Sequence, residues 1–333
     1  MRRKIAFLSI FLVLITITTV PLYAQMKKLG QTGFKFLDVE VGARATGMGE
    51  AFTTIGTGAN AIFFNPAGIA QMEADKFEIT FCRTDWLAET SLDAFALVYN
   101  LGILGKLGFS LVTTDFGNIA GTTVNRETEQ GYDEIGNLDL GAYAAGISYA
   151  RALTDKFMIG GNVRYAREKL GTSLFSDSYT MDSTWLKDNK ASALSFDMGT
   201  LFYPGLKSFR VGMCIRSYSP QVKYEEDAFQ LPLTFHVAIG MDILDFFGEH
   251  PDQSFLVDFE LVHPRDYIQR YHLGGEFSYK GMFFLRGGYK FNYDEEGLCA
   301  GVGFRTGGII LDYSYSDFGV FDFVNRVSLG VSF

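Results

Sequence analysis

The last nine residues of the chain alternate strictly between apolar and polar side chains. The apolar positions are Val327, Leu329, Val331 and Phe333, and the positions between them are Arg326, Ser328, Gly330 and Ser332. This period of two predicts a β-strand with one apolar and one polar face. Similar alternation recurs back to residue 77. A membrane barrel must pair its last strand with its first to leave no open edge, so the pattern predicts an outer-membrane β-barrel.

About fourteen segments alternate over roughly the 9–11 residues that a tilted barrel strand needs. The predicted strands cover residues 77–83, 93–101, 105–117, 139–153, 156–171, 193–204, 208–218, 231–244, 252–264, 271–280, 282–292, 297–306, 309–317 and 325–333. Short connections alternate with long ones at 118–138, 172–192 and 219–230, as expected for periplasmic turns and external loops. Only 245–251 is longer than a periplasmic turn should be. The expected fold is therefore all-β, an antiparallel transmembrane barrel over 77–333.

Charged side chains recur on the polar face of these predicted strands. The basic ones are Arg164, Arg210, Arg216, Arg286 and Lys290, and the acidic ones are Asp197, Asp242, Asp258, Glu260, Glu276 and Asp312. Such charges are costly against lipid, so they are expected to face the lumen. The balance of signs favours an interior crossed by ion pairs or filled by a plug. The alternative is that the charges solvate a water-filled lumen.

The N-terminus has the form of a secretory signal peptide. Arg2, Arg3 and Lys4 precede an uncharged apolar run over 5–20, and cleavage is expected after Ala24. No later run of eighteen apolar residues occurs, which argues against membrane-spanning helices. Abundant Gly (37), Phe (32) and Tyr (17) with few Pro (7) suit barrel strands and aromatic girdles. A soluble β-sandwich is the remaining alternative.

Charge and motif content exclude several function classes. The net charge of −9 argues against nucleic acid as a partner. Cys82, Cys214 and Cys299 lie far apart on expected inward faces, which predicts buried thiols rather than a zinc site or disulfide framework. The four histidines lack metal-ligand spacing, and no nucleophile motif fixes a catalytic triad. We therefore expect a protein that is not an enzyme and that has no metal or cofactor.

Residues 25–76 lack barrel alternation and are rich in small residues, which favours a compact plug, or hatch, inside the barrel. Asn65 is a good helix N-cap and Pro66 a good first helical residue, so a short helix is expected there. A periplasmic extension is the alternative. The candidate hatch and ligand-contacting residues are Arg44, Gly47, Met48, Gly49, Asn60, Phe63, Phe64, Asn65, Pro66 and Met72. Among them, Arg44 is a candidate partner for a ligand carboxylate.

The run from Val41 to Ala70 resembles the start of mature PorV/PorQ-family proteins, through its GARATGMGEAF and NPAGIA blocks. That family is related to the FadL type of fourteen-stranded transporter. The resemblance implies that Asn65 and Pro66 belong to a hatch inside the barrel. It leaves function divided, because PorV-like members handle cargo of type IX secretion whereas FadL-type members pass hydrophobic small molecules. The leading prediction is a secretion-associated barrel, with FadL-like transport as the alternative and a purely structural barrel as a third possibility.

The expected location is the bacterial outer membrane, and the expected partners follow from it. They are membrane lipids and lipopolysaccharide, together with either secreted protein cargo or a hydrophobic small molecule. The acidic side chains of the long connections, among them Glu127, Glu129 and Asp133, could bind divalent ions that bridge lipopolysaccharide. A solvated, lipid-repelling loop face is the favoured interpretation of these residues.

Overall fold

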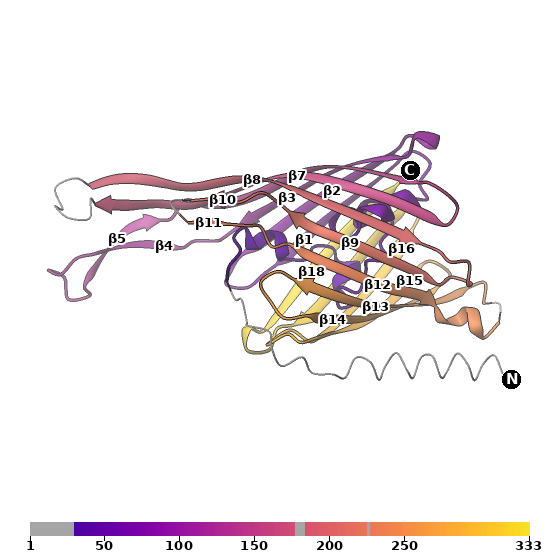
Figure 1. Cartoon of the computed structure of the whole chain (residues 1–333). Helices are drawn as coiled ribbons and strands as arrows, with labels where there is room; N and C mark the ends of the chain where they lie inside the picture. Colours follow the sequence, from indigo (N-terminus) through magenta and orange to yellow (C-terminus); the bar gives the residue numbers. More distant parts are fainter. Residues whose placement is uncertain (1–29, 177–183, 225–226, 249) are drawn as a thin grey trace.

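The computed structural model describes residues 30–176, 184–224, 227–248 and 250–333, and the predicted signal peptide lies outside these ranges. Fourteen strands form a closed antiparallel barrel (Figure 1). They are β1 (Phe77–Asp85), β2 (Ser91–Asn100), β3 (Lys106–Asp115), β6 (Leu140–Ala152), β7 (Phe157–Ser176), β8 (Thr184–Phe202), β9 (Arg210–Tyr218), β12 (Thr234–Asp242), β13 (Gln253–Pro264), β14 (Arg270–Tyr279), β15 (Phe283–Phe291), β16 (Leu298–Thr306), β17 (Ile309–Asp317) and β18 (Phe323–Ser332). The predicted fold class and strand number are confirmed.

The barrel closes where the last strand meets the first. β18 pairs antiparallel with β1, with Leu329 opposite Phe81, and the backbone N–H of Lys76 donates to the carbonyl of Phe333 at 2.8 Å. Each neighbouring pair around the ring is antiparallel, so the strands leave no open edge.

Alternation along each strand sorts side chains between the outside and the lumen. In β18, Val327 and Leu329 are 47% and 46% exposed, whereas Arg326 and Ser328, which alternate with them, are buried. The outer face is thus apolar and the inner face polar, as in membrane barrels. Within the described ranges, no helix has both the length and the apolar character needed to cross a membrane.

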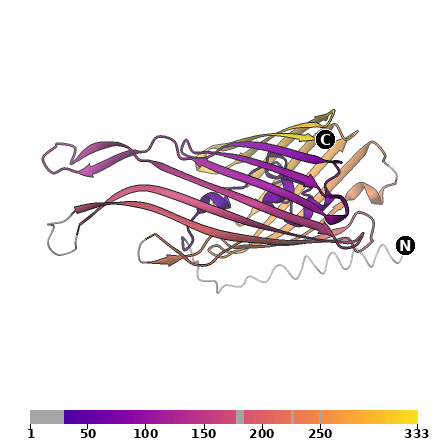
Figure 2. The same ribbon diagram turned by 90° about the horizontal axis from the view of Figure 1, so that it is seen from above.

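The two ends of the barrel differ in the length of their connections. We call one the turn end, because short connections such as 153–156 and 307–308 lie there together with the end of β18. The other is the loop end, where β7 and β8 continue beyond the ring as a long hairpin (Figures 1 and 2). Two further pairs lie at this end: β4 (Ala120–Val124) with β5 (Tyr132–Asn137), and β10 (Val222–Lys223) with β11 (Ala228–Phe229).

These loop-end strands differ from the sequence-based expectation, which treated 118–138, 172–192 and 219–230 as loops. In β5, for example, all six residues are exposed. A hairpin in water buries neither face, so no apolar alternation marks it. At the turn end, the long 245–251 connection overlaps a 3-10 turn, η5 (Ile243–Phe246).

Residues 30–76, which we call the inner segment, pass through the lumen from the loop end to the turn end (Figure 2). Near its start, the N–H of Gly33 donates to the carbonyl of Gln230 at 3.2 Å, and its end adjoins β1. Its turns are η1 (Lys35–Asp38), α2 (Ala43–Thr46), η2 (Gly58–Phe63) and η3 (Pro66–Gln71); η4 (Gly102–Leu104) and η6 (Gly319–Phe321) lie in barrel connections. α2 contacts β16 to β18, whereas η3 contacts β6 to β8, so the inner segment packs against opposite walls.

Candidate functional site

A chain of alternating charges joins the inner segment to the barrel wall. Arg44 of α2 donates to both carboxylate oxygens of Glu276 on β14, at 2.9 and 2.7 Å. Glu276 also accepts from Arg286 on β15 at 2.5 Å, and Arg286 donates to Asp312 on β17 at 2.7 Å. Glu276 and Arg286 stand directly opposite each other across the two strands. Each buried charge in this chain therefore has at least one opposite neighbour.

Two carboxylates on β13 hold the next turn of the inner segment. Glu260 accepts from the backbone N–H groups of Phe52 and Thr53, each at 3.1 Å. Asp258, two residues earlier on the same face, accepts from the N–H and the hydroxyl of Thr54. The ring of His236 lies 2.6 Å from Glu260. Charge-assisted bonds of this kind are the strong ones, so they fix 52–54 against the wall.

Asn65 connects the inner segment to β8 and begins η3. Its side-chain nitrogen donates to the carbonyls of Thr53 and Thr200, at 3.0 and 3.1 Å, and its oxygen accepts from the N–H of Ala67 at 3.1 Å. The predicted capping role of Asn65, with Pro66 following, is present, although the turn that it caps is a 3-10 turn. A Cβ at Gly199 would lie 1.9 Å from the Asn65 oxygen, so the wall needs a glycine there.

Ion pairs of the inner segment at the loop end involve Glu40 and Glu50. Glu40 pairs with Arg216 of β9 at 2.5 Å, and Glu50 pairs with Lys290 of β15 at 2.7 Å. Lys290 also contacts Glu296. Burial opposes ionisation of Glu50, but the charge of Lys290 outweighs it and lowers the pKa of Glu50 to about 2.

This lowered pKa makes the attachment at Glu50 sensitive to acid. A carboxyl with a lowered pKa stabilises the folded state above its unfolded pKa, and that stability is lost as the pH falls through the folded pKa. We expect the inner segment to loosen as the pH falls from 4.5, the ordinary pKa of a glutamate side chain, to about 2, the pKa of Glu50 in the folded protein. Conductance of the protein in planar bilayers, measured against pH, checks this. A Glu50→Gln variant should have weaker pH dependence in this window, and an unchanged profile would contradict the assignment.

Two polar cavities lie on either side of the inner segment. The turn-side cavity, of about 370 Å³, is lined by Arg44, Asn60, Glu78 and Glu276 among others. Arg210 also lines it, and its Nε and one Nη find no partner in the part of the chain that the structure describes. The loop-side cavity, of about 270 Å³, is lined by Glu40, Glu50 and Lys290 among others. In the sequence, Gly47 to Gly49 of the inner segment lie between Arg44, which lines the turn-side cavity, and Glu50, which lines the loop-side cavity.

An apolar cluster occupies the opposite side of the lumen at the loop end. Phe34, Phe36 and Leu37 of the inner segment are all buried there. They pack with five alanines of β6, β7 and β8 that are also buried, namely Ala142, Ala144, Ala166, Ala191 and Ala193. Barrel interiors are usually polar, but this alanine wall is apolar, as is the buried inward face of β2.

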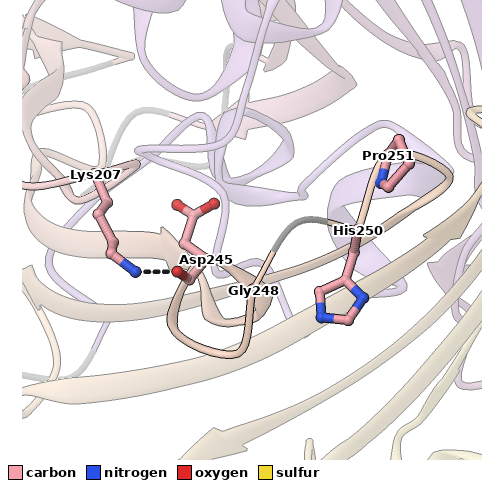
Figure 3. Close-up of a pocket in the computed structure, with 5 residues that line it drawn as sticks. All are labelled: Lys207, Asp245, Gly248, His250 and Pro251. Carbon is pink, nitrogen blue, oxygen red and sulfur yellow. Dashed lines mark hydrogen bonds between the residues drawn. The ribbon is translucent and has the colours of Figure 1, made fainter.

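A shallow hollow at the turn end lies between the β8–β9 and β12–β13 connections (Figure 3). Its volume is about 720 Å³, and it is lined by Lys207, Asp245, Gly248, His250 and Pro251. Lys207 donates to the backbone carbonyl of Asp245 across it, as the dashed line shows. None of the residues predicted for the hatch or the lumen lines this hollow.

The structure brings some predicted site residues together and separates others. Arg44 meets Glu276 and Arg286, and the 47–49 stretch, with Met48 fully buried, lies against wall glycines. Arg164 pairs instead with Asp197 of β8, at 2.9 Å. Phe63, Phe64 and Met72 were predicted to line a ligand path. They belong to the buried core of the inner segment and do not line either of these two cavities, and their place on a ligand path stays a prediction.

Several residues that shape the loop end of the lumen were not predicted from the sequence. Glu40, Glu50 and Arg270 line the loop-side cavity, and Phe34 and Phe36 pack on the alanine wall. Acidic residues in the otherwise apolar, small-residue stretch 39–52 were the available signal. The three cysteines are buried and free, as their strand positions predicted.

Comparisons with known proteins support the fold class. No family model and no curated protein matches the chain. Among solved structures, the CymD monoaromatic hydrocarbon channel aligns with a TM-score of 0.58 at 13% identity, covering 89% of this chain and 98% of that one. The Pseudomonas putida toluene transporter TodX aligns with a TM-score of 0.57 at 12% identity, covering 88% and 98%. A Pseudomonas aeruginosa FadL homologue aligns with a TM-score of 0.53 at 10% identity, covering 89% and 99%. The chain thus has the fold of FadL-type outer-membrane barrels.

Proposed function

We propose that the protein is an outer-membrane channel for small hydrophobic molecules, with the inner segment as its hatch. The observation that carries the proposal is the alanine wall at the loop end, covered by Phe34, Phe36 and Leu37. An apolar surface inside a polar lumen is suited to an apolar solute, because burial there releases the solute from water. Two of the similar structures, a hydrocarbon channel and a toluene transporter, agree with this class of solute.

Orientation in the membrane follows from the lengths of the connections. Short turns of outer-membrane barrels face the periplasm and long loops face outward. The turn end is therefore assigned to the periplasm and the β7–β8 extension to the exterior. A solute arriving from outside would first meet Phe34, Phe36 and Leu37, which cover the alanine wall, and would have to pass the inner segment to reach the turn-side cavity.

Handling of secreted protein cargo, as in PorV-like proteins, stays a prediction. Two of the similar structures named above are a hydrocarbon channel and a toluene transporter, and the lumen of this barrel is crossed by the inner segment. The apolar wall lies inside the barrel, where a small solute fits better than a folded protein. Transport is therefore the function that the geometry supports best.

The test compares one inward with one outward position on β8. Ala193 lies on the alanine wall, whereas the neighbouring Leu194 is half exposed on the outer face. We expect Ala193→Asn to slow uptake of labelled toluene several-fold, because it places an unpaired amide on the apolar wall, where it costs about 1–3 kcal/mol. Uptake should be measured in cells that lack the chromosomal copy and express each variant.

Two outcomes separate the proposal from its alternatives. Leu194→Asn is the matched control and should leave uptake unchanged, provided that both variants run as heat-modifiable folded barrels on gels. Toluene uptake that is the same with and without the gene would overturn the transport proposal.

A further inference from the structure

The loop-side cavity holds polar groups that the protein itself leaves unpaired. It lies between the inner segment and the loop ends of β12 to β15, with a volume of about 270 Å³. Among the described residues, His272 Nδ1, Glu40 Oε2 and Arg270 Nε have no hydrogen-bond partner. His272 is only 3% exposed, and its other ring nitrogen contacts the Tyr293 hydroxyl at 2.8 Å. Buried polar atoms are normally paired with protein or ordered water, so these atoms are free to bind water or a ligand in the cavity.

The charges around the cavity nearly cancel. Three basic and four acidic side chains line it. Lys290 lies between Glu50 and Glu296, Lys35 contacts Asp38 and Asp266, and Glu40 is paired with Arg216 just behind the wall. The site therefore has no strong field of either sign. A free carboxylate would approach Glu40, Glu50 and Glu296, and an ammonium would approach Lys290 and Arg270.

Aromatic rings give the same cavity an apolar component. The guanidinium of Arg270 lies 4.4 Å from the ring centre of Tyr267 and 4.0 Å from that of Tyr293. Stacking between two rings holds this group in place, and it forms no ion pair within the described ranges. Trp86, from the β1–β2 connection, lines the same cavity. A ligand would thus meet ring faces as well as hydrogen-bonding groups.

We propose that the loop-side cavity binds a small uncharged molecule that carries a hydroxyl group on an apolar ring. A hydroxyl donates one hydrogen bond and accepts two, so a single group can accept from Arg270 and donate to Glu40 or His272. It brings no net charge into a site whose own charges are balanced. The inference deepens the proposed function, on which it rests, by specifying that alcohols or phenols are among the hydrophobic solutes and that their hydroxyl group is bound in this cavity.

The test uses three soluble probes with one ring and different head groups: cyclohexanol, cyclohexanecarboxylate and cyclohexylammonium. The full chain, in detergent and with Trp185→Phe, leaves Trp86 as its only tryptophan. Emission from Trp86 then reports binding. We expect the dissociation constant for cyclohexanol to be at least about tenfold lower than for the charged probes, which corresponds to about 1.4 kcal/mol. Tighter binding of either charged probe, or no emission change with cyclohexanol, would overturn the proposal.

Two variants and one control locate the binding. Arg270→Gln and Glu40→Leu should each weaken cyclohexanol binding about tenfold, whereas Arg305→Gln, in the turn-side cavity, should not. Equal affinity in all three variants would place the probe elsewhere and overturn the assignment, and heat-modifiability on gels confirms that each variant is folded. Probe binding without cellular uptake would refute transport but keep the site. Toluene uptake without probe binding would refute the site alone.

Discussion

Replacing Gly288 by valine is expected to displace the inner segment from the barrel wall. A Cβ at Gly288 would lie 2.2 Å from the carbonyl carbon of Met48, a distance that no rotamer change can relieve because both atoms are backbone or directly attached to it. Overpacking in a well-filled interior typically costs 1–3 kcal/mol, and a backbone clash is at the upper end of this range. We expect a lower unfolding temperature and a larger single-channel conductance in planar bilayers.

The adjacent residue supplies the control. Gly287 points outward on the same strand, and a Cβ there would meet nothing within 4 Å. Gly287→Val also favours the strand conformation, so its stability and conductance should match those of the unmodified protein. If both variants behave alike, the close approach of Met48 does not hold the inner segment.

Much of the barrel could be predicted from the sequence because its environment imposes a period of two. Lipid on one side and a polar lumen on the other leave a distinct pattern, seen in the alternation of β18 from Arg326 to Val331. The alternation also stops where a strand ends, and β17 was predicted and is found at 309–317. Where both faces are exposed, as in β5, the pattern disappears and the strand went unpredicted.

The site residues could be predicted only in part, because the side chains that pair with one another are far apart in the sequence. The inward position of Glu276 follows from strand alternation, but its contact with Arg44 joins residues 232 positions apart. Glu50 and Lys290 are 240 apart, and nothing near either residue specifies the other. The alanine wall is hidden for another reason. An inward alanine is compatible either with a tightly packed polar interior or with an apolar chamber. Only the contacts with Phe34 and Phe36 show that this part of the interior is apolar.

Removal of the Glu276 carboxylate should have the largest effect of any single change in the charge chain. Glu276 is 2% exposed and accepts from both Arg44 and Arg286, so Glu276→Leu leaves two buried guanidinium groups facing each other without their shared anion. Breaking a buried pair costs about 3–5 kcal/mol. Because the barrel strands keep their backbone hydrogen bonds, we expect the inner segment to separate from the wall before the barrel unfolds.

Conductance and unfolding of the Glu276→Leu protein measure these two events separately. A large rise in conductance at a temperature where gels still show the folded barrel would mean that the charge chain holds the hatch. Asp93→Asn is the control, because the Arg83–Asp93 pair, joined at a similar distance of 2.8 Å, has side chains that are 50% and 37% exposed. Exposed pairs contribute about 0–1 kcal/mol, since water screens them. Equal effects of the two substitutions would show that burial of the Arg44–Glu276–Arg286 chain adds nothing to its strength.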